Sequence, residues 1–392
     1  MSSLGENEQR KIAMRLSERA RKQVVGLRSQ IGLTTIRHSP PAQSQAKLTG
    51  MATAFRLIRI LTLFTILCAN GGFGASEEPI MKAVVAHEYG APEVLKFEEV
   101  SRPEPKDDEA LVRVIASGVN PADPLTLSGK YAREWGTNLP LIPGYEISGI
   151  IEKAGAKFTS LKPGDAVYGY PTFGGGWAEY VTVKEWEVAP KPKSLSFAEA
   201  AAVPMGALTA WQALVNEAQL HKGQTILIHG GSGGVGSFAV QIAKVRGARV
   251  IATASTANQD LLRQLGADVA IDYTKQKFEE IAKDVDCVLD PVGKDTLARS
   301  YAVVKKGGII LALVARPDPE ELKKHQIRVA GIWVKPNAKD LSDIAKLIDA
   351  GKIKPIVTQV RPLSEAIAAE QQAETHHTRG KVVLRIADEP KG

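Results

Sequence analysis

Residues His229–Lys244, which read HGGSGGVGSFAVQIAK, decide the fold of this chain of 392 residues. The apolar run Thr225–Ile228 directly before them predicts a short strand, and apolar periodicity through Val245 predicts a helix. A strand, a glycine-rich turn and a helix N-terminus in this order are typical of a site that binds a dinucleotide pyrophosphate. The N–H groups of the turn and the positive end of the helix attract the phosphates.

The glycine spacing strengthens this interpretation. Gly230, Gly233 and Gly236 follow the pattern G-x-x-G-x-x-G, with two further glycines between them. A side chain at these positions would block the approach of the phosphates or the packing of the helix on the strand. An ordinary flexible turn is the alternative, but it does not need five glycines framed by a strand and a helix. The residues expected to contact the dinucleotide are Gly230, Ser232, Gly233, Gly234, Val235 and Gly236.

The net charge of +7 is concentrated at the N-terminus, because residues 1–80 carry +6 of it. The rest of the chain is near neutral, which argues against nucleic-acid binding by the folded part. The length predicts two or three domains, and the composition is that of a soluble globular protein. Cys68 and Cys287 are too few for a four-cysteine zinc site or a disulfide framework, and they fit a reducing compartment.

Residues 1–80 form a basic leader, which we expect to be disordered or to result from a wrongly assigned translation start. A transit peptide is an alternative for its first part, which has few acidic residues. Residues 51–75 have the layout of a secretory signal: two arginines, a short apolar run and then small residues. Met1, Met51 and Met81 are therefore candidate starts. We expect a cytoplasmic protein, with an exported or membrane-tethered form as the alternative.

The remaining sequence changes pattern twice. Residues 81–207 contain short strands and Gly/Pro turns, which predicts an antiparallel, barrel-like domain. Residues 208–346 alternate strand and helix, which is typical of a doubly wound parallel sheet. Residues 347–392 return to a strand–helix–strand pattern that we expect to rejoin the first domain. The strands expected in the parallel sheet are Thr225–Ile228, Arg249–Ala254, Val269–Ile271, Cys287–Leu289, Gly308–Leu313 and Val329–Val334.

Five further motifs occur along the body of the chain. They are SGVNPAD at Ser117–Asp123, PGYEISG at Pro143–Gly149, LKPGDAV at Leu161–Val167, AAAVPMGALTAW at Ala200–Trp211 and HTRGKVVL at His377–Leu384. With the glycine loop, residues 81–386 resemble the medium-chain dehydrogenase/reductase superfamily, in its zinc-free NADPH quinone oxidoreductase and enone (alkenal) reductase branch. The resemblance implies an α/β fold: a Rossmann-type doubly wound parallel sheet domain that binds NADP, plus a GroES-like antiparallel β-barrel domain that binds substrate.

The resemblance and ligand chemistry both disfavour zinc. Zinc alcohol dehydrogenases of this superfamily place a cysteine near the position of Asn120 and a histidine directly before the glutamate that corresponds to Glu146. The residues here are Asn120 itself and Tyr145, and neither is a usual zinc ligand. We therefore predict chemistry without a metal.

The segment after the glycine loop favours NADPH over NADH. An NAD site usually carries Asp or Glu at the end of the second strand, where it binds the ribose 2′-OH. Here Thr253–Asn258 contains no acid, and the first one is Asp260. Because hydroxyls donate to a 2′-phosphate that a carboxylate would repel, Ser255 and Thr256 are candidate phosphate contacts. The alternative is that they cap the next helix.

The resemblance implies three more cofactor contacts. These are Thr209, Tyr273 beside the adenosine phosphate, and Arg379. Their alternatives are a threonine at a helix start, a plain surface tyrosine and a solvated charge, respectively.

Without zinc, the protein has to polarise the acceptor carbonyl with hydrogen-bond donors while the cofactor supplies hydride. An enone then becomes an enolate and a quinone becomes a hydroquinone anion. Asn120 is the candidate for positioning the nicotinamide or the substrate, with an amide that braces a proline turn as the alternative. Tyr131 and Tyr145 are candidate donors or proton sources, and for Tyr131 a lining aromatic is the alternative.

The leading hypothesis is thus an NADPH-dependent oxidoreductase that transfers hydride to a quinone or an α,β-unsaturated carbonyl. A trans-enoyl thioester reductase is an alternative, although the sequence shows no plain acyl channel or basic patch for a carrier phosphate. An NADPH-binding structural or interaction protein is the alternative of another class. The resemblance implies a homodimer that pairs the edge strand Val329–Val334. We expect a small-molecule partner, no nucleic acid, and a membrane only if residues 51–75 are retained.

Overall fold

The computed structural model describes residues 79–130, 132, 136, 138–375 and 378–390. Contacts divide the chain into residues 1–76 and 77–392, and all described residues belong to the second unit. The leader, including the signal-like residues 51–75, therefore falls outside the described part, except for its last two residues. Among the described residues, no helix has the length and apolar character needed to cross a membrane.

Six parallel strands form one sheet of the unit, in the order β10-β9-β8-β11-β12-β13. The strand order reverses between β8 and β11, and doubly wound sheets bind ligands at the carboxyl ends of the strands at such a point. The strands are β8 (Thr225–Ile228), β9 (Arg249–Ala254), β10 (Val269–Asp272), β11 (Val285–Asp290), β12 (Val304–Ala312) and β13 (Arg328–Gly331). All six were expected, and the bounds of β8 and β9 coincide with the prediction.

Two predicted boundaries are wrong by three residues or more, and the other bounds of β10 to β13 differ from the prediction by at most two residues. β12 begins at Val304 rather than Gly308, because the backbone of its polar, glycine-containing first half continues the strand. β13 ends at Gly331 rather than Val334, although the sequence remains apolar, because its pairing with β12 stops there.

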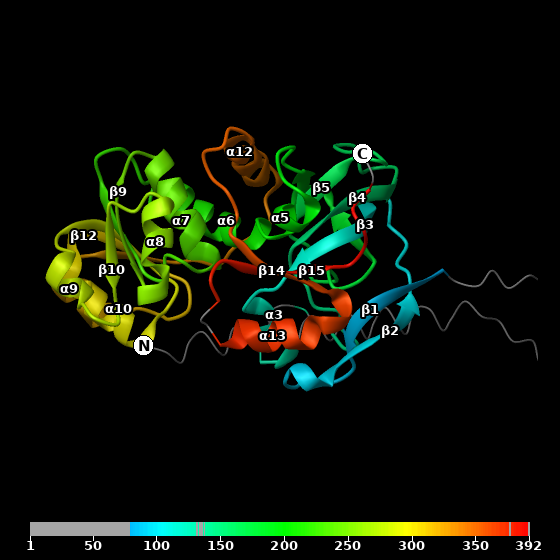
Figure 1. Cartoon of the computed structure of the whole chain (residues 1–392), viewed down its shortest axis with the longest axis horizontal. Coiled ribbons are helices and arrows are strands. Elements are labelled where there is room, and N and C mark those ends of the chain that lie inside the picture. Colours follow the sequence, from blue (N-terminus) through cyan, green and yellow to red (C-terminus); the bar gives the residue numbers. More distant parts are fainter. Residues whose placement is uncertain (1–78, 131, 133–135, 137, 376–377, 391–392) are drawn as a thin grey trace, which may run out of the picture. The chain divides into compact units, whose positions relative to one another are not determined.

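Helices cover both faces of this sheet, so its strands are apolar on both sides. In Figure 1, α7 and α8 lie on one side of β9 and β10, and α9 lies on the other. One face carries α6 (Pro204–Trp211), α7 (Gly234–Val245), α8 (Gln259–Gln264) and α12 (Ala338–Asp349). The other carries α9 (Phe278–Ile281), α10 (Lys294–Ser300) and α11 (Pro319–His325). A π-helical turn, η3 (Gln212–Glu217), follows α6.

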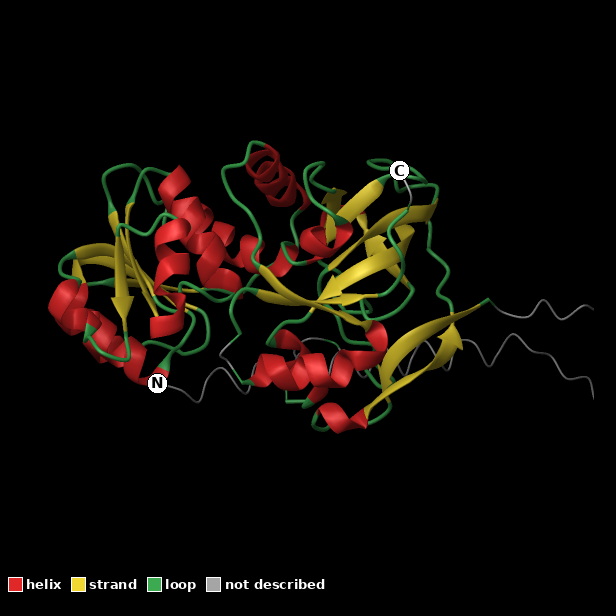
Figure 2. Cartoon of the chain, viewed as in Figure 1, coloured by secondary structure: helices red, strands yellow, loops and turns green. Residues whose placement is uncertain are grey.

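A second sheet has the order β14-β15-β3-β4-β5-β7, with β6 also paired to β3 (Figure 2). Its pairs are antiparallel except β14 with β15. The strands are β3 (Glu109–Gly118), β4 (Ile147–Ala154), β5 (Ala166–Gly169), β6 (Tyr180–Lys184), β7 (Val188–Pro190), β14 (Val357–Pro362) and β15 (Lys381–Arg385). β1 (Ile80–Ala86) and β2 (Leu95–Ser101) form a separate pair. Short helices are α3 (Ala122–Leu127), α5 (Phe197–Ala201) and α13 (Ala366–Glu374).

The C-terminal segment returns to the antiparallel sheet. Here β14, α13 and β15 follow one another, and β15 pairs with β3. The domain boundaries expected at 207/208 and 346/347 fall inside α6 and α12. Both helices pack into the core of the parallel sheet, so the division into domains stays a prediction.

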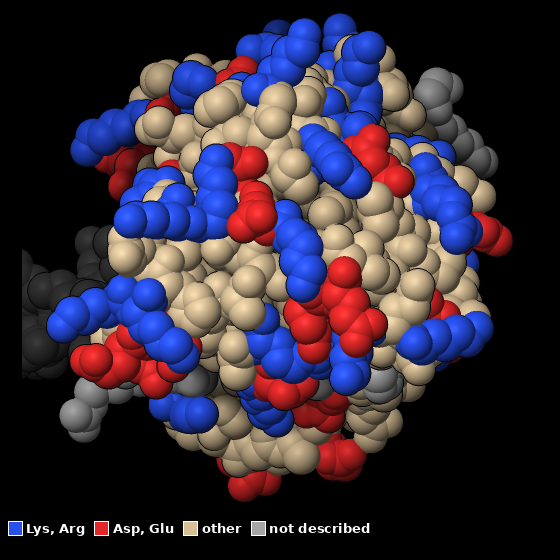
Figure 3. All heavy atoms as spheres, turned by 90° about the vertical axis from the view of Figure 1, so that its left-hand side faces the viewer, with Lys and Arg blue, Asp and Glu red and all other residues tan. Residues whose placement is uncertain are grey.

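Charges are interspersed on the outer face of the parallel-sheet part. Figure 3 shows basic and acidic side chains beside one another on the face it displays, with no field of one sign. Ion pairs join opposite charges in this part of the chain, such as Arg299 with Glu279 at 2.5 Å. This mixture is consistent with the near-neutral charge of the sequence beyond the leader.

Glu370 on α13 is a buried acid, and its two carboxyl oxygens have no hydrogen-bond partner within the described part of the chain. Its side chain has no exposed surface. Burial, reinforced by the charges of Asp123 and Glu374, raises its pKa from the ordinary 4.5 to about 10. The folded chain therefore keeps a proton on Glu370 at neutral pH, whereas the unfolded chain loses it above about pH 4.5.

Stability should consequently fall as pH rises from about 4.5 towards 10, because the unfolded state binds fewer protons in that range. Glu370→Gln preserves the shape of the neutral acid and removes this dependence. We expect the variant to match the native chain at pH 5 and to exceed it at pH 8 by on the order of 3 kcal/mol in urea unfolding. Glu320→Gln, at an exposed acid of α11 that does not contribute to the shift of Glu370, is the control. Equal pH slopes for all three proteins would contradict the assignment.

Candidate functional site

The glycine loop joins the end of β8 to the start of α7, and the backbones of the loop and the helix lie very close together there. Gly230 has a φ of +58°, a left-handed conformation that favours glycine. A Cβ on Gly236 would lie 2.2 Å from the carbonyl oxygen of Gly230, so the helix can approach the strand this closely only with glycine there. Gly233 is the N-cap of α7 and offers no side chain to the first N–H groups of the helix. These groups remain for a ligand, as the sequence predicts for a pyrophosphate.

The predicted loop residues all lie at this carboxyl edge of the sheet. Gly230, Gly233, Gly234 and Val235 are partly exposed, whereas Ser232 is buried. The carbonyl oxygen of Ser232 accepts a hydrogen bond from the Gly380 N–H at 2.8 Å. The loop is thus in contact with the C-terminal segment.

That C-terminal segment continues from the loop into the antiparallel sheet. Gly233 and Gly380 form an isolated parallel bridge, and Lys381 begins β15 directly after it. A Cβ on Gly234 would lie 3.0 Å from Cδ of Lys381, so the lysine stem passes along the first residue of α7. Lys381 therefore connects the phosphate loop with the second sheet.

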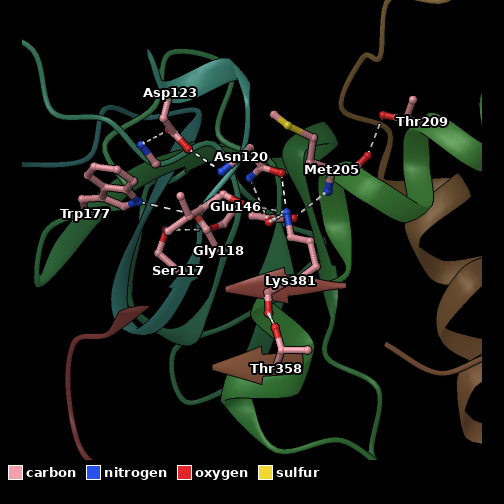
Figure 4. A network of polar contacts seen from close by, with 12 residues as sticks. Ser117, Gly118, Asn120, Asp123, Glu146, Trp177, Met205, Thr209, Thr358 and Lys381 are labelled. Atoms are coloured by element: carbon pink, nitrogen blue, oxygen red, sulfur yellow. Dashed lines mark hydrogen bonds and ion pairs between the residues drawn. The ribbon is translucent and has the colours of Figure 1, made fainter. Parts of the chain in front are cut away.

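A buried polar network surrounds the Lys381 ammonium (Figure 4). Nζ lies 2.5 Å from Oε1 of Glu146, donates to the Val119 carbonyl oxygen at 3.1 Å, and donates to Oδ1 of Asn120. Asn120 Nδ2 donates to the same Glu146 oxygen at 2.8 Å. The other oxygen of Glu146 accepts the Met205 N–H in the first turn of α6, at 2.9 Å. Asn120, predicted as a positioning residue, is thus held on both sides of its amide.

Asp123 fixes the turn that carries Asn120. Its two carboxylate oxygens accept the N–H groups of Asn120 at 2.7 Å and Gly144 at 2.9 Å. Burial raises the pKa of Asp123, although these hydrogen bonds and the Lys381 charge oppose the shift. The carboxyl ties the Asn120 turn to the segment that leads to Tyr145 and Glu146. The sequence placed Asp123 nearby but could assign it no role.

Tyr145 is buried beside α3, and its hydroxyl oxygen lies 2.7 Å from Thr126 Oγ1. Thr126 already donates its single hydroxyl proton to the Ala122 carbonyl oxygen, so Tyr145 is the donor to Thr126. Burial raises the pKa of Tyr145, which keeps this proton in place. Tyr145 must break this bond before it can donate elsewhere. Tyr131, the other predicted donor, lies outside the described residues.

The predicted contacts for the adenosine phosphate lie at the ends of β9 and β10. The Thr256 hydroxyl donates to Oδ2 of Asp272 at 2.6 Å, so its proton is not directed to a phosphate here. Ser255 Oγ accepts from Asn258 Nδ2 at 3.1 Å and keeps its own proton to donate. Ser255 makes no side-chain cap bond to the helical turn that follows. Tyr273, next to Asp272, is 51% exposed.

The two remaining predicted contacts come from different elements. Thr209 is buried in α6 and donates its hydroxyl proton to the Met205 carbonyl oxygen at 2.7 Å. Arg379 is exposed and directly precedes Gly380, the residue that is hydrogen-bonded to the glycine loop. Its own carbonyl oxygen accepts a bond from Thr358.

Sequence reasoning missed the central member of the site, Lys381. The residue was visible in the motif HTRGKVVL, where a lysine directly precedes the apolar residues Val382–Leu384 of a buried strand. A lysine in such a place needs acceptors. Among the described residues, no group of three or more His, Cys, Asp or Glu side chains is placed to hold a metal ion.

Comparisons with known proteins cover both parts of this fold. Residues 106–193 match the family described as "Alcohol dehydrogenase GroES-like domain", and residues 265–384 match the family described as "Zinc-binding dehydrogenase". With the parallel sheet, these matches confirm the predicted fold class, a Rossmann-type sheet plus a GroES-like part.

Individual relatives extend over most of the chain. The 2-methylene-furan-3-one reductase of Solanum lycopersicum is 36% identical, over 91% of this chain and 92% of its own length. The "NADPH-dependent alkenal/one oxidoreductase, chloroplastic" of Arabidopsis thaliana is 38% identical, over 78% of this chain and 79% of its own. The solved quinone oxidoreductase of Coxiella burnetii is 34% identical, with a TM-score of 0.74 over 79% of this chain and all of that one.

The close approach of Gly236 to the Gly230 carbonyl oxygen predicts the effect of adding a methyl group at position 236. Gly236→Ala places Cβ against the Gly230 carbonyl, so the loop must shift. We expect a loss of about 1–3 kcal/mol in urea unfolding and at least about tenfold weaker NADPH binding by fluorescence titration. Gly331→Ala is the control for unfolding, because a Cβ there meets nothing within 4 Å. Unchanged NADPH affinity in Gly236→Ala would show that the loop does not bind the dinucleotide.

Proposed function

Because the chain belongs to the medium-chain dehydrogenase/reductase superfamily, in its quinone and enone reductase branch, we propose a function within that branch. The protein is an NADPH-dependent oxidoreductase that transfers hydride to a quinone or an α,β-unsaturated carbonyl without zinc. One observation carries the proposal: the glycine loop and the buried Asn120 amide are connected by the single residue Lys381. A dinucleotide on the loop therefore lies beside hydrogen-bond donors suited to a carbonyl.

The cradle fits a dinucleotide by its own chemistry. Partly exposed glycines and a helix N-terminus would hold the pyrophosphate. The exposed Arg379 adds a positive charge next to Gly380, and the predicted contact Thr209 lies in α6. At the other end, Ser255 keeps a free proton for the 2′-phosphate, with Tyr273 exposed nearby. Thr256 would have to give up its bond to Asp272 to contribute.

The residues around Asn120 suit a reaction in which negative charge develops on an acceptor oxygen. Bound NADPH supplies the hydride. The Asn120 amide, held by charged neighbours, presents a fixed donor that needs no reorganisation as the charge develops. Tyr145 holds a proton next to this turn and can deliver it to an enolate after leaving Thr126.

The same residues do not fit a catalytic zinc ion. Asn120 and Tyr145 stand where zinc enzymes of the superfamily carry Cys and His. Both oxygens of Glu146 are engaged, one with the Lys381 ammonium and one with the Met205 N–H. The positive charge next to this carboxylate thus comes from a lysine. The family name "Zinc-binding dehydrogenase" describes relatives, and the donor set here supports hydride transfer without metal.

The assay that tests the proposal mixes the full chain with NADPH and, separately, a benzoquinone, a short 2-alkenal and a crotonyl thioester. We expect NADPH oxidation with the quinone or the alkenal, slower oxidation with NADH, and no change after treatment with chelators. Tight NADPH binding without oxidation of it by any acceptor would favour the binding-protein alternative. Turnover only with the thioester would favour the enoyl thioester reductase, and faster turnover with NADH would overturn the cofactor assignment.

Two finer proposals concern assembly and location. The edge strand β13 carries Val329, which is 41% exposed, and is followed by Trp333, which is 63% exposed. This edge supports a homodimer, since pairing two edges buries apolar surface. Sedimentation of the full chain at the mass of a monomer would contradict it. A cytoplasmic location is supported by the need for reduced cofactor and by the two cysteines. A native N-terminus just after residues 69–75, found by sequencing, would contradict that location.

A further inference from the structure

The Lys381 ammonium has three polar partners. It donates hydrogen bonds to the Val119 carbonyl oxygen and the Asn120 amide oxygen, and it forms an ion pair with a Glu146 carboxylate oxygen. The lysine side chain is 5% exposed, and the glutamate has no exposed surface. The ammonium is therefore enclosed by protein groups that balance its charge and engage two of its three donors. Any role of Lys381 in the reaction is therefore exerted through the residues it holds.

The charges on either side of Asn120 fix the direction of its amide. Oδ1 faces the ammonium of Lys381, and Nδ2 faces the carboxylate of Glu146 (Figure 4). The flipped amide would place its NH₂ group against the ammonium and its oxygen against the carboxylate, and both contacts would be repulsive. The two charges thus select one orientation of a group that is otherwise nearly symmetric in shape.

In this orientation, one N–H donor of the Asn120 amide has no acceptor among the residues that the structure describes. Nδ2 carries two N–H groups, and only the bond to Glu146 uses one of them. The bond from the ammonium to Oδ1 also withdraws electrons through the amide, which strengthens its N–H groups as donors. The Asn120 amide is therefore both aligned and polarised by Lys381.

The network is also attached to the elements that carry the dinucleotide site. The Lys381 stem passes Gly234 at the start of α7, and the preceding Gly380 N–H is bonded to Ser232. Glu146 accepts the Met205 N–H in α6, the helix that carries Thr209. Lys381 and Glu146 thus connect the Asn120 amide with the glycine loop and with α6.

We propose that Lys381 is a positioning residue for hydride transfer. It holds the Asn120 amide so that the second Nδ2–H faces the oxygen of the bound acceptor. This inference rests on the proposed function, because it names the acceptor's carbonyl oxygen as the group that receives the hydrogen bond. Lys381 itself touches neither the acceptor nor the phosphates in this arrangement.

The test is a double-mutant cycle in the full chain with Lys381→Met, Asn120→Ala and both changes together. Removing a donor to a developing oxyanion lowers kcat by about 100-fold or more, which we expect for Asn120→Ala. Lys381→Met should lower kcat by at least about tenfold while the Kd for NADPH changes by less than about threefold. The double variant should match Asn120→Ala to within about threefold, because Lys381 acts only through the amide. Arg385→Met, exposed on the same strand, is the control and should keep the native kcat.

Lys381→Met leaves the Glu146 charge buried without its partner and can prevent folding. Glu146→Gln with Lys381→Met removes both charges and is the second variant. It should unfold at a urea midpoint near that of the native chain and still show the loss in kcat, because nothing then selects the direction of the Asn120 amide. A native kcat in this variant would overturn the proposal. The proposal would also be overturned if the loss in kcat of the Lys381→Met, Asn120→Ala double variant equalled the product of the two single losses.

The two proposals fail in different ways. If the native chain oxidises no NADPH with any acceptor, the proposed function fails. The interaction between Lys381 and Asn120 is then measured from the urea midpoints of the same single and double variants. If the shifts in midpoint of the two single variants add up in the double variant, the interaction is absent; a smaller shift in the double variant supports it. If the native chain turns over but Lys381→Met affects only NADPH binding, the proposed function stands and the positioning role of Lys381 is wrong.

Discussion

The buried ammonium of Lys381 is the constraint on which the geometry of the site depends. A charge removed from water without a partner costs several kcal/mol, so the lysine can be buried only where opposite charge and acceptors converge. Glu146 supplies the charge, and Asn120 and Val119 supply the other acceptors. These groups come from β15, from the segment before β4 and from the turn after β3. The three segments must therefore meet correctly for the protein to bury the pair.

Four buried ionisable groups near the site are accommodated in three different ways. Lys381 and Glu146 neutralise each other, whereas Asp123 accepts two backbone N–H groups. Glu370 has no hydrogen-bond partner among the described residues and instead keeps its proton. Keeping Glu370 protonated lowers the stability at any pH at which the unfolded chain would ionise this acid. The neutral acid, however, adds no further charge beside α3. Charge in this region is therefore concentrated in the Lys381–Glu146 pair, where it acts on the Asn120 amide.

What the sequence could predict depended on how far apart the interacting residues are. The glycine loop lies within one short segment, so spacing and flanking apolar runs were enough to locate it and the strands beside it. β12 was placed too late because Lys305 and Lys306 look like a loop, although their backbone continues the strand. Lys381 and Asn120 are 261 positions apart, and no local pattern reports such a contact. Likewise, Asp272, which accepts the hydrogen bond of the Thr256 hydroxyl, belongs to a different strand, β10, from the one that precedes Thr256.

A site without a metal has to stabilise a developing oxyanion with neutral donors, and such donors work well only when they are already aligned. An amide clamped between an ammonium and a carboxylate is aligned by their field, and the pair adds little net charge of its own. In the proposed reaction without metal, fixed geometry thus takes the place that a cation has in zinc enzymes. A site of this kind recognises the position of an oxygen relative to the hydride rather than the charge of the acceptor. Quinones and enones both place a conjugated oxygen away from the carbon or oxygen that accepts hydride, which explains how one arrangement of donors can serve either class.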